Sequence, residues 1–299
     1  MSAVAMMRIL SVIMTAGCGR LCVMQASVVK TARDRMQALC TRLNLSLRFA
    51  ELVRKLRGAG ARVNSSCGLH CHINAAPHTP KTLRNIVNIM AAKEDLLYKA
   101  LKVNVSREHY CQKMDTRFLD EINNRPPMSM DQFKSMWYDG EDYSYRHYDD
   151  TRYHALNLHS VFYKGTIEFR LFNSTLHAGE VKSAIQLCLA ISHQALIQKS
   201  ARHAKTQSDN EKYTFRTWLL RLGLIGDEFK TARHHLLKNL EGNIAWKDPA
   251  QAEKQKERLA QKRAAELNNT NENININESE VNPVSNDEQE EASDFVMSM

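Results

Sequence analysis

The sequence predicts an α+β fold, with a mostly antiparallel sheet whose polar face is open and whose other face is covered by helices. Two stretches alternate polar and apolar residues as β-strands do, and segments with helical periodicity follow both of them. The composition, 43% hydrophobic and 25% charged residues, is that of an ordinary globular protein. We divide the 299 residues into an atypical N-terminal segment over 1–44, a folded domain over 45–248 that ends in a helical pair, and a charged helix with a disordered, acidic, Asn-rich tail over 249–299.

The N-terminal segment is rich in Met, Ala, Val and Cys, and residues 9–14 form an apolar run. It resembles a lipoprotein signal only faintly, because the run is short and Thr15 stands where such signals carry Leu. No window reaches the roughly 20 apolar residues of a membrane span. We therefore expect a cytoplasmic protein with no membrane partner.

The net charge of +8 is unevenly distributed along the chain. Residues 1–93 contain fourteen Lys and Arg and two acidic residues, whereas residues 266–299 contain nine acidic residues and no Lys or Arg. A basic first third could meet nucleic acid, phosphates or acidic lipid. The basic residues are not interleaved with aromatic residues in a compact array, so nucleic acid is not the expected partner.

The first alternating stretch is Ser66–Asn74, which follows an amphipathic helix predicted over 43–56. On a strand, His70 and His72 share one face with Gly68 and Asn74. The other face is apolar and should contact the core; it carries Leu69, Cys71 and Ile73. Two histidines in this arrangement suit a metal or a phosphate contact, although a single imidazole on a strand is more often structural.

Cysteines beside these histidines raise the alternative of a zinc site. On a strand, however, Cys71 points away from both His70 and His72, so we do not expect a zinc cluster. The seven cysteines of the chain are odd in number and irregularly spaced. These features indicate reduced thiols.

Helices are predicted at several points after this strand. Thr79 caps a helix that has Pro80 at its first position and continues to about Leu101. Ser129 begins a second, short helix with the pattern of a capping box. Further helical segments are expected at residues 178–198, 215–222, 227–240 and 254–263.

The second alternating stretch is Thr166–Phe172. Its polar face holds Glu168 and Arg170, which taken alone could be a solvated pair of little energetic value. Before it, a Tyr- and Asp-rich loop is expected over 138–150 and strand character over 152–158. The Lys164-Gly165 turn between the two strand segments predicts a hairpin.

Three segments in this order resemble the amidoligase family: Cys67-Gly68-Leu69-His70-Cys71-His72, then Arg152-Tyr153 with Asn157, then Gly165-Thr166-Ile167-Glu168-Phe169-Arg170-Leu171-Phe172. The resemblance covers residues 45–246. It implies a glutamine-synthetase-like carboxylate–amine ligase, which uses ATP and Mg²⁺ to form an amide or peptide bond through an acyl phosphate. The implied partners are an amino-acid, peptide or protein carboxylate and an amine.

The resemblance also implies residue roles. Arg152, Glu168 and Arg170 would be catalytic, because the two cations hold phosphate as it transfers. His70, His72 and Asn157 would contact the nucleotide or substrate, and His70 and Glu168 would bind Mg²⁺.

The chain departs from the family pattern at its start, where such enzymes carry a Gly-x-Glu-x-Glu strand that supplies metal ligands. No Glu precedes Glu51 here, so we expect a truncated or frame-disrupted N-terminus and reduced activity. Two alternatives stay open. One is an inactive amidoligase-like module that binds a nucleotide or a partner. The other is a cupin-like metal enzyme built on His70 and His72, although the next Glu, Glu94, is too distant for that pattern.

Overall fold

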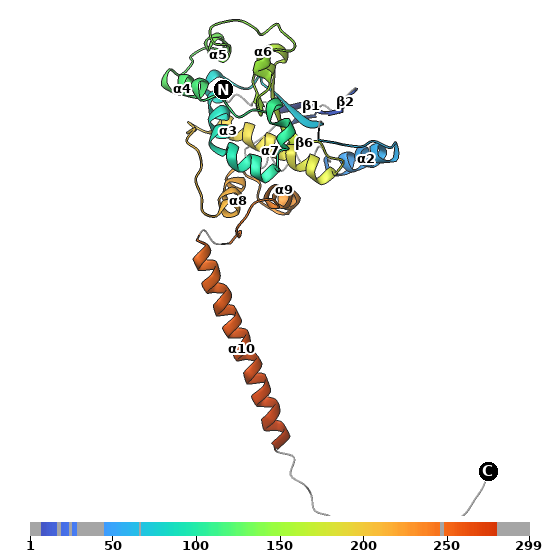
Figure 1. Ribbon diagram of the computed structural model, residues 1–299, viewed down its shortest axis with the longest axis vertical. Coiled ribbons are helices and arrows are strands. Elements are labelled where there is room, and N and C mark those ends of the chain that lie inside the picture. Colours follow the sequence, from blue (N-terminus) through green and yellow to red (C-terminus); the bar gives the residue numbers. More distant parts are fainter. Residues whose placement is uncertain are drawn as a thin grey trace, which may run out of the picture. The chain divides into compact units, whose positions relative to one another are not determined.

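The computed structural model describes residues 7–16, 19–23, 26–28, 45–65, 67–245 and 248–279. The chain divides into two compact units, Met1–Lys247 and Asp248–Met299. The predicted α+β class is confirmed, because the first unit combines an antiparallel sheet with helices (Figure 1). No helix among the described residues is long and apolar enough to cross a membrane.

The sheet has the strand order β2-β1-β4-β6-β5, with β3 also paired to β1, and every pairing is antiparallel. The strands are β1 (Met7–Ala16), β2 (Gly19–Val23), β3 (Ala26–Val28), β4 (Gly68–Asn74), β5 (Leu156–Asn157) and β6 (Thr166–Asn173). The sequence interpretation assigned no strand to residues 1–44. In the structure, β1 occupies the place beside β4, so the sheet extends on that side of the two predicted strands.

The helices of the first unit are α2 (Leu45–Gly58), α3 (Pro80–Leu101), η1 (Val105–Tyr110), α4 (Thr116–Asn124), α5 (Met130–Trp137), η2 (Asp150–Arg152), α6 (His159–Lys164), α7 (Ala178–Ile197), α8 (Glu211–Arg221), η3 (Asp227–Phe229) and α9 (Lys230–Leu237). The predicted caps are confirmed: Thr79 caps α3, and the Ser129 side chain accepts a hydrogen bond from the Gln132 amide at the start of α5. Both side chains satisfy amides that the first helical turn leaves unpaired.

The core lies on the face of the sheet that the alternation assigned to it. Leu69, Cys71 and Ile73 of β4 are buried together with Ile167 and Phe169 of β6. Helices α3 and α7 pack against these strands and against one another. On α3 the buried apolar side chains include Leu83, Ile86 and Val87, as the helical periodicity predicts. On α7 every side chain from Ser183 to Ser192 is buried, so this part of the helix is enclosed on all sides and not along a single stripe.

The connection between β5 and β6 differs from the predicted tight hairpin. The two strands do pair antiparallel, but β5 holds only Leu156 and Asn157, and the short helix α6 joins them. Gly165 ends α6 with a φ of 69°, a left-handed conformation that glycine adopts without strain. Arg152, which the sequence placed on a strand, lies in η2 instead.

The polar face of the sheet is not open, contrary to the prediction. His70, His72, Glu168 and Arg170 are 9%, 3%, 4% and 5% exposed, respectively. Contacts from η1 and α6 reach this face, because Arg170 bonds to the Tyr110 carbonyl and Ser160 bonds to Thr166. The face is therefore a buried polar layer, in which each group needs a hydrogen-bond partner.

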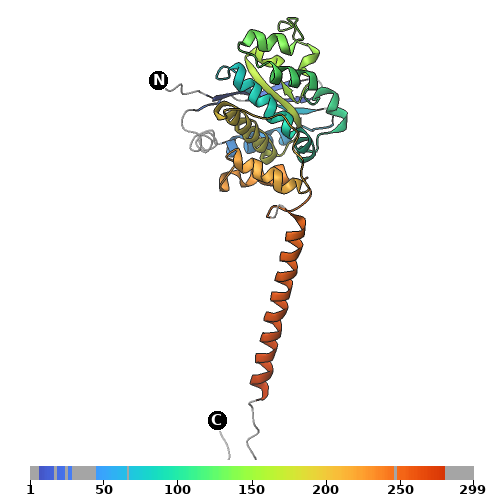
Figure 2. The ribbon, with the colours of Figure 1, turned by 90° about the vertical axis from the view of Figure 1, so that its left-hand side faces the viewer.

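In the second unit, α10 (Pro249–Ser279) is a single helix (Figure 2). It is longer than the helical run predicted for residues 254–263 and extends past Asn268, where the sequence interpretation placed the start of the disordered tail. The rest of the predicted tail, residues 280–299, lies outside the described residues.

Candidate functional site

The register of the sheet brings the sequence-predicted residues to Glu168. On one side of β6, His72 of β4 pairs directly with Glu168; on the other side, Asn157 of β5 pairs with the same residue. Directly paired residues on antiparallel strands point to the same face. Glu168 therefore lies between a histidine and an amide on one sheet face.

A β-bulge shapes the next part of the site. Leu69 pairs with Phe172 and Cys71 pairs with Phe169, so the single residue His70 lies opposite two residues, Arg170 and Leu171. Such a bulge changes which face the following side chains occupy. Arg170 shares the Glu168 face by simple alternation, and the bulge lets Phe172 pack into the core beside Leu171.

The Glu168 carboxylate accepts from four donors. Oε1 lies 2.9 Å from His70 Nδ1, 3.4 Å from His72 Nε2 and 3.1 Å from an Arg170 guanidinium nitrogen. The other oxygen, Oε2, accepts from Asn157 Nδ2 at 2.5 Å. In the structure, Asn157 thus contacts Glu168, whereas the family resemblance implied a contact to substrate or nucleotide.

This environment sets the charge of both acid and histidine. Burial alone would raise the pKa of Glu168, but the hydrogen bonds from His70 and His72 and the charge of Arg170 hold that pKa well below its usual range. Burial lowers the pKa of His70 to about 4, even though its bond to Glu168 acts in the opposite direction. At neutral pH the site therefore contains an ionised Glu168 and a neutral His70.

A chain of hydroxyl groups orients His72. Thr166 Oγ1 lies 3.0 Å from His72 Nδ1 and 2.6 Å from Ser160 Oγ. His72 Nε2 faces the carboxylate, and in the tautomer that donates from Nε2 the Nδ1 atom accepts from the Thr166 hydroxyl. The Thr166 oxygen in turn accepts from Ser160. This chain holds one tautomer of His72.

Arg107 supports the site from η1, and the sequence interpretation missed it. Its guanidinium donates to the backbone carbonyls of Phe172 at 2.6 Å and Arg170 at 2.9 Å, the residues on either side of Leu171 in the bulge. A Cβ at Gly68 would overlap this guanidinium, so a glycine is needed there. The Gly before the histidines was the only local sign of this contact.

Arg152 approaches the site through an aromatic ring. Its guanidinium carbon lies 5.8 Å from the centre of the Tyr153 ring, and that of Arg170 lies 5.8 Å from the same ring. Arg152 also donates to the His147 carbonyl at 2.9 Å. Two guanidinium groups thus share Tyr153, a residue that the sequence motif contained but to which we had assigned no role.

The predicted magnesium ligands do not fit that ion. Mg²⁺ takes hard oxygen ligands in octahedral geometry, and both oxygens of Glu168 are already engaged by hydrogen-bond donors. The described residues contain no group of three or more His, Cys, Asp or Glu side chains that could hold a metal ion. On β1, the register places Ser11 opposite His72 and Ile13 opposite His70, and the strand has no acidic residue.

Comparison with known protein families places the site within a recognised segment. Residues 47–192 match the model of a family described as "putative amidoligase enzyme". No curated protein and no solved structure matches the chain. The resemblance to the amidoligase family is therefore confirmed over residues 47–192, and this family suggests a ligase-type function. The glutamine-synthetase-like fold is not confirmed by a solved structure.

Proposed function

We propose, from the premise that residues 47–192 match the amidoligase family, that this chain is an ATP-dependent carboxylate–amine ligase. Its reactants would be the carboxylate of an amino acid, peptide or protein and an amine. The residues that we assign to the reaction are Arg152, Glu168 and Arg170, supported by His70, His72 and Asn157.

The observation that carries this proposal is the position of Arg152 and Arg170 on the Tyr153 ring. Arg107 adds a third guanidinium beside Arg170. Among the site residues named above, Glu168 is the carboxylate that contacts Arg170. Three guanidinium groups therefore lie near one another, and guanidinium groups are the donors best matched to phosphate and carboxylate. A cluster of guanidinium groups suits the phosphate and carboxylate anions of this reaction.

The chemistry needs this charge. A carboxylate is a poor acyl donor, so one of its oxygens first takes the γ-phosphoryl group of ATP and ADP leaves. The amine nitrogen then attacks the acyl carbon, the bond from carbon to the phosphate oxygen breaks, and the amine releases a proton. Transfer of this kind depends on positioning and on stabilisation of the negative charge that develops.

The neutral His70 is better suited to orientation than to proton transfer. A general base works best when its pKa is near the working pH, and burial lowers the pKa of His70 to about 4. His72 is engaged on both ring nitrogens. We therefore assign both histidines to holding Glu168, and through it Arg170, in place.

A second candidate is an amidoligase-like module that binds a nucleotide or a partner without turnover. The absence of acidic residues from β1 favours it, because no carboxylate of that strand can add to Glu168. Since Glu168 is already occupied by four donors, phosphoryl transfer would have to proceed without a carboxylate-held Mg²⁺ from these residues. This candidate predicts binding of ATP with no ligation.

The experiment that separates the two measures ATP binding by calorimetry, and ATP hydrolysis with a panel of acids and amines. The variant is Arg152→Gln, and the matched control is Arg146→Gln. Arg146 belongs to the loop that leads into η2 and also lies against a tyrosine, 4.2 Å from the Tyr143 ring centre, but it is exposed. Ligation that is lost in Arg152→Gln and kept in Arg146→Gln supports the ligase.

The other outcomes are equally informative. ATP binding without turnover, weakened only by Arg152→Gln, supports the non-catalytic module. Turnover that Arg152→Gln leaves unchanged would remove the shared Tyr153 site from the mechanism. If ATP neither binds nor reacts, the ligase and the nucleotide-binding form of the module are both wrong.

A further inference from the structure

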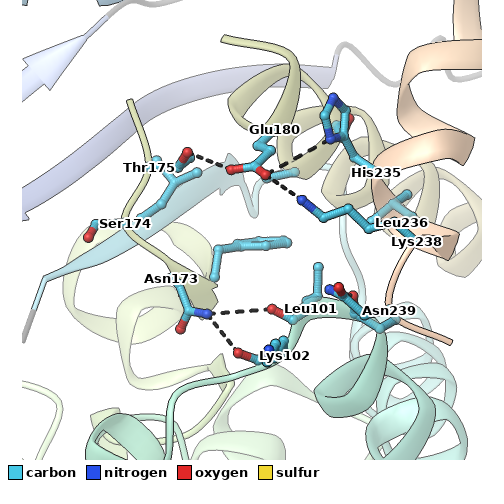
Figure 3. Close-up of a pocket in the computed structure, with 15 residues that line it drawn as sticks. Leu101, Lys102, Asn173, Ser174, Thr175, Glu180, His235, Leu236, Lys238 and Asn239 are labelled. Atoms are coloured by element: carbon cyan, nitrogen blue, oxygen red, sulfur yellow. Dashed lines mark hydrogen bonds and ion pairs between the residues drawn. The ribbon is translucent and has the colours of Figure 1, made fainter. Parts of the chain in front are cut away.

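A cavity of about 310 Å³ lies between the last turn of α3, the segment that links β6 to α7, and α9 (Figure 3). It is separate from the Glu168 site, because Leu69 and Phe172 line it and both belong to the core side of the sheet. Its volume is at the lower end of the range for small-molecule sites, roughly 300–1,000 Å³. It can therefore hold a small ligand.

The lining of the cavity is divided by polarity. Leu69, Leu101, Phe172, Ala184 and Leu236 provide an apolar surface. At the other side, the carboxylate of Glu180, the ammonium group of Lys238 and the imidazole of His235 lie together (Figure 3). An apolar lining with a few convergent polar groups is typical of small-molecule sites.

The polar groups form one network. Glu180 Oε1 lies 2.6 Å from Lys238 Nζ and 4.0 Å from His235 Nδ1, while Glu180 Oε2 accepts from the Thr175 hydroxyl at 2.5 Å. The side chains of Glu180 and Lys238 are 33% and 40% exposed, so a ligand in the cavity can reach both. The network thus presents a negative and a positive group next to each other.

Each member of the network has hydrogen-bonding capacity to spare. A lysine ammonium has three donors and a carboxylate accepts at about four positions, and these two groups use only part of that capacity on one another. His235 Nδ1 is buried without a hydrogen-bond partner among the described residues. Such an unpaired buried nitrogen is costly unless a ligand or water satisfies it.

Gly179 makes room for this arrangement. A Cβ at this position would lie 2.8 Å from His235 Nε2 and 3.0 Å from His177 Cε1. The absent side chain lets both imidazoles lie against the first turn of α7. The positive end of that helix also favours a negatively charged group nearby.

We propose that this cavity binds a free α-amino acid with an apolar side chain. The ammonium group of the ligand contacts Glu180, its carboxylate contacts Lys238 and His235, and its side chain packs on Leu101 and Phe172. A zwitterion satisfies both charges of the network at once, whereas a simple acid or a simple amine satisfies only one. The proposal is independent of the ligase assignment, because it uses neither Glu168 nor the arginines around it.

The test measures dissociation constants by calorimetry for three ligands of similar shape: L-leucine, 4-methylpentanoate, which lacks the amino group, and isoamylamine, which lacks the carboxylate. For the full chain we expect leucine to bind about tenfold or more tightly than either analogue, because each charged contact is lost in one of them. Glu180→Gln should weaken leucine binding until its dissociation constant equals that of 4-methylpentanoate. Lys238→Met should weaken leucine binding until its dissociation constant equals that of isoamylamine.

Glu121→Gln is the control, since Glu121 forms an ion pair with Arg125 away from the cavity. It should leave all three constants unchanged, and melting curves of every variant should establish that it is folded. No binding of leucine at about 10 mM, or equal binding of all three ligands, would overturn the proposal. So would a preference for leucine that neither Glu180→Gln nor Lys238→Met reduces.

Discussion

Glu168 and Arg170, two residues apart on β6, form an ion pair with a 3.1 Å contact while only 6% of each side chain is exposed. The sequence alone favoured a solvated pair of little value at these positions. Their burial changes the energetics, because an isolated charge in the interior is far more costly than one in water. Contacts from His70, His72 and Asn157 to Glu168 offset part of the cost of burying the pair.

We expect Glu168→Gln to destabilise the protein, because it leaves the charge of Arg170 buried without a counter-charge. Removing one partner of a buried pair typically costs about 3–5 kcal/mol. The free energy of unfolding, measured by urea denaturation, should fall by an amount of this order. Glu121→Gln, which breaks an exposed pair with Arg125, should change it by less than about 1 kcal/mol. Equal effects of the two variants would contradict the burial of the pair.

Stability should decrease as the pH falls below about 6.5. In the folded protein burial lowers the pKa of His70 and of His78 to about 4, so between pH 6.5 and 4 these groups bind protons in the unfolded chain but not in the folded one. Glu168, whose folded pKa lies well below its usual range, adds a loss that begins near pH 4.5. Denaturation at a series of pH values measures both.

The control for this pH dependence is a pair of histidine variants. His70→Gln should reduce the slope of stability against pH between 6.5 and 4, since the proton taken up on unfolding is removed with the imidazole. His109→Gln, at an exposed position, should leave the slope as it is. An unchanged slope in His70→Gln would show that His70 is already protonated in the folded state.

Gly68→Ala should be destabilising, because its Cβ would displace the Arg107 guanidinium from the Phe172 and Arg170 carbonyls. Overpacking of this kind costs about 1–3 kcal/mol. Gly58→Ala is a matched control, since a Cβ there meets nothing within 4 Å and should be neutral or slightly stabilising. If Gly68→Ala were also neutral in urea denaturation, Arg107 would not hold the position that we describe.

Thr166→Val should break the hydroxyl chain that orients His72. The substitution keeps the shape of the side chain but leaves His72 Nδ1 buried without a donor, at a cost of about 1–3 kcal/mol. Ser106→Ala removes a hydroxyl from an exposed position and should cost less. Nuclear magnetic resonance of the imidazole nitrogens should show a shift of the His72 Nδ1 signal, from loss of its hydrogen bond, only in Thr166→Val.

Alternation along two short stretches was enough to assign the sides of the sheet. Leu69, Cys71 and Ile73 pack into the core while His70 and His72 lie on the opposite face, as their positions in the sequence predict. The caps at Thr79 and Ser129 could also be predicted, because a cap is a contact between residues three positions apart. These features depend on near neighbours in the chain, and the sequence by itself determined them.

Other features depend on contacts between distant segments, and only the tertiary structure decided them. The bulge opposite His70 follows from the pairing of β4 with β6, about 100 residues apart in the chain, and it lets Phe172 enter the core together with Leu171, although simple alternation would place Phe172 on the Glu168 face. Arg107 reaches the site from a short 3₁₀-helix that carries no motif. The place of β1 beside β4 is likewise a matter of long-range pairing. No local pattern encodes such contacts, because their energy comes from groups that meet only once the chain has folded.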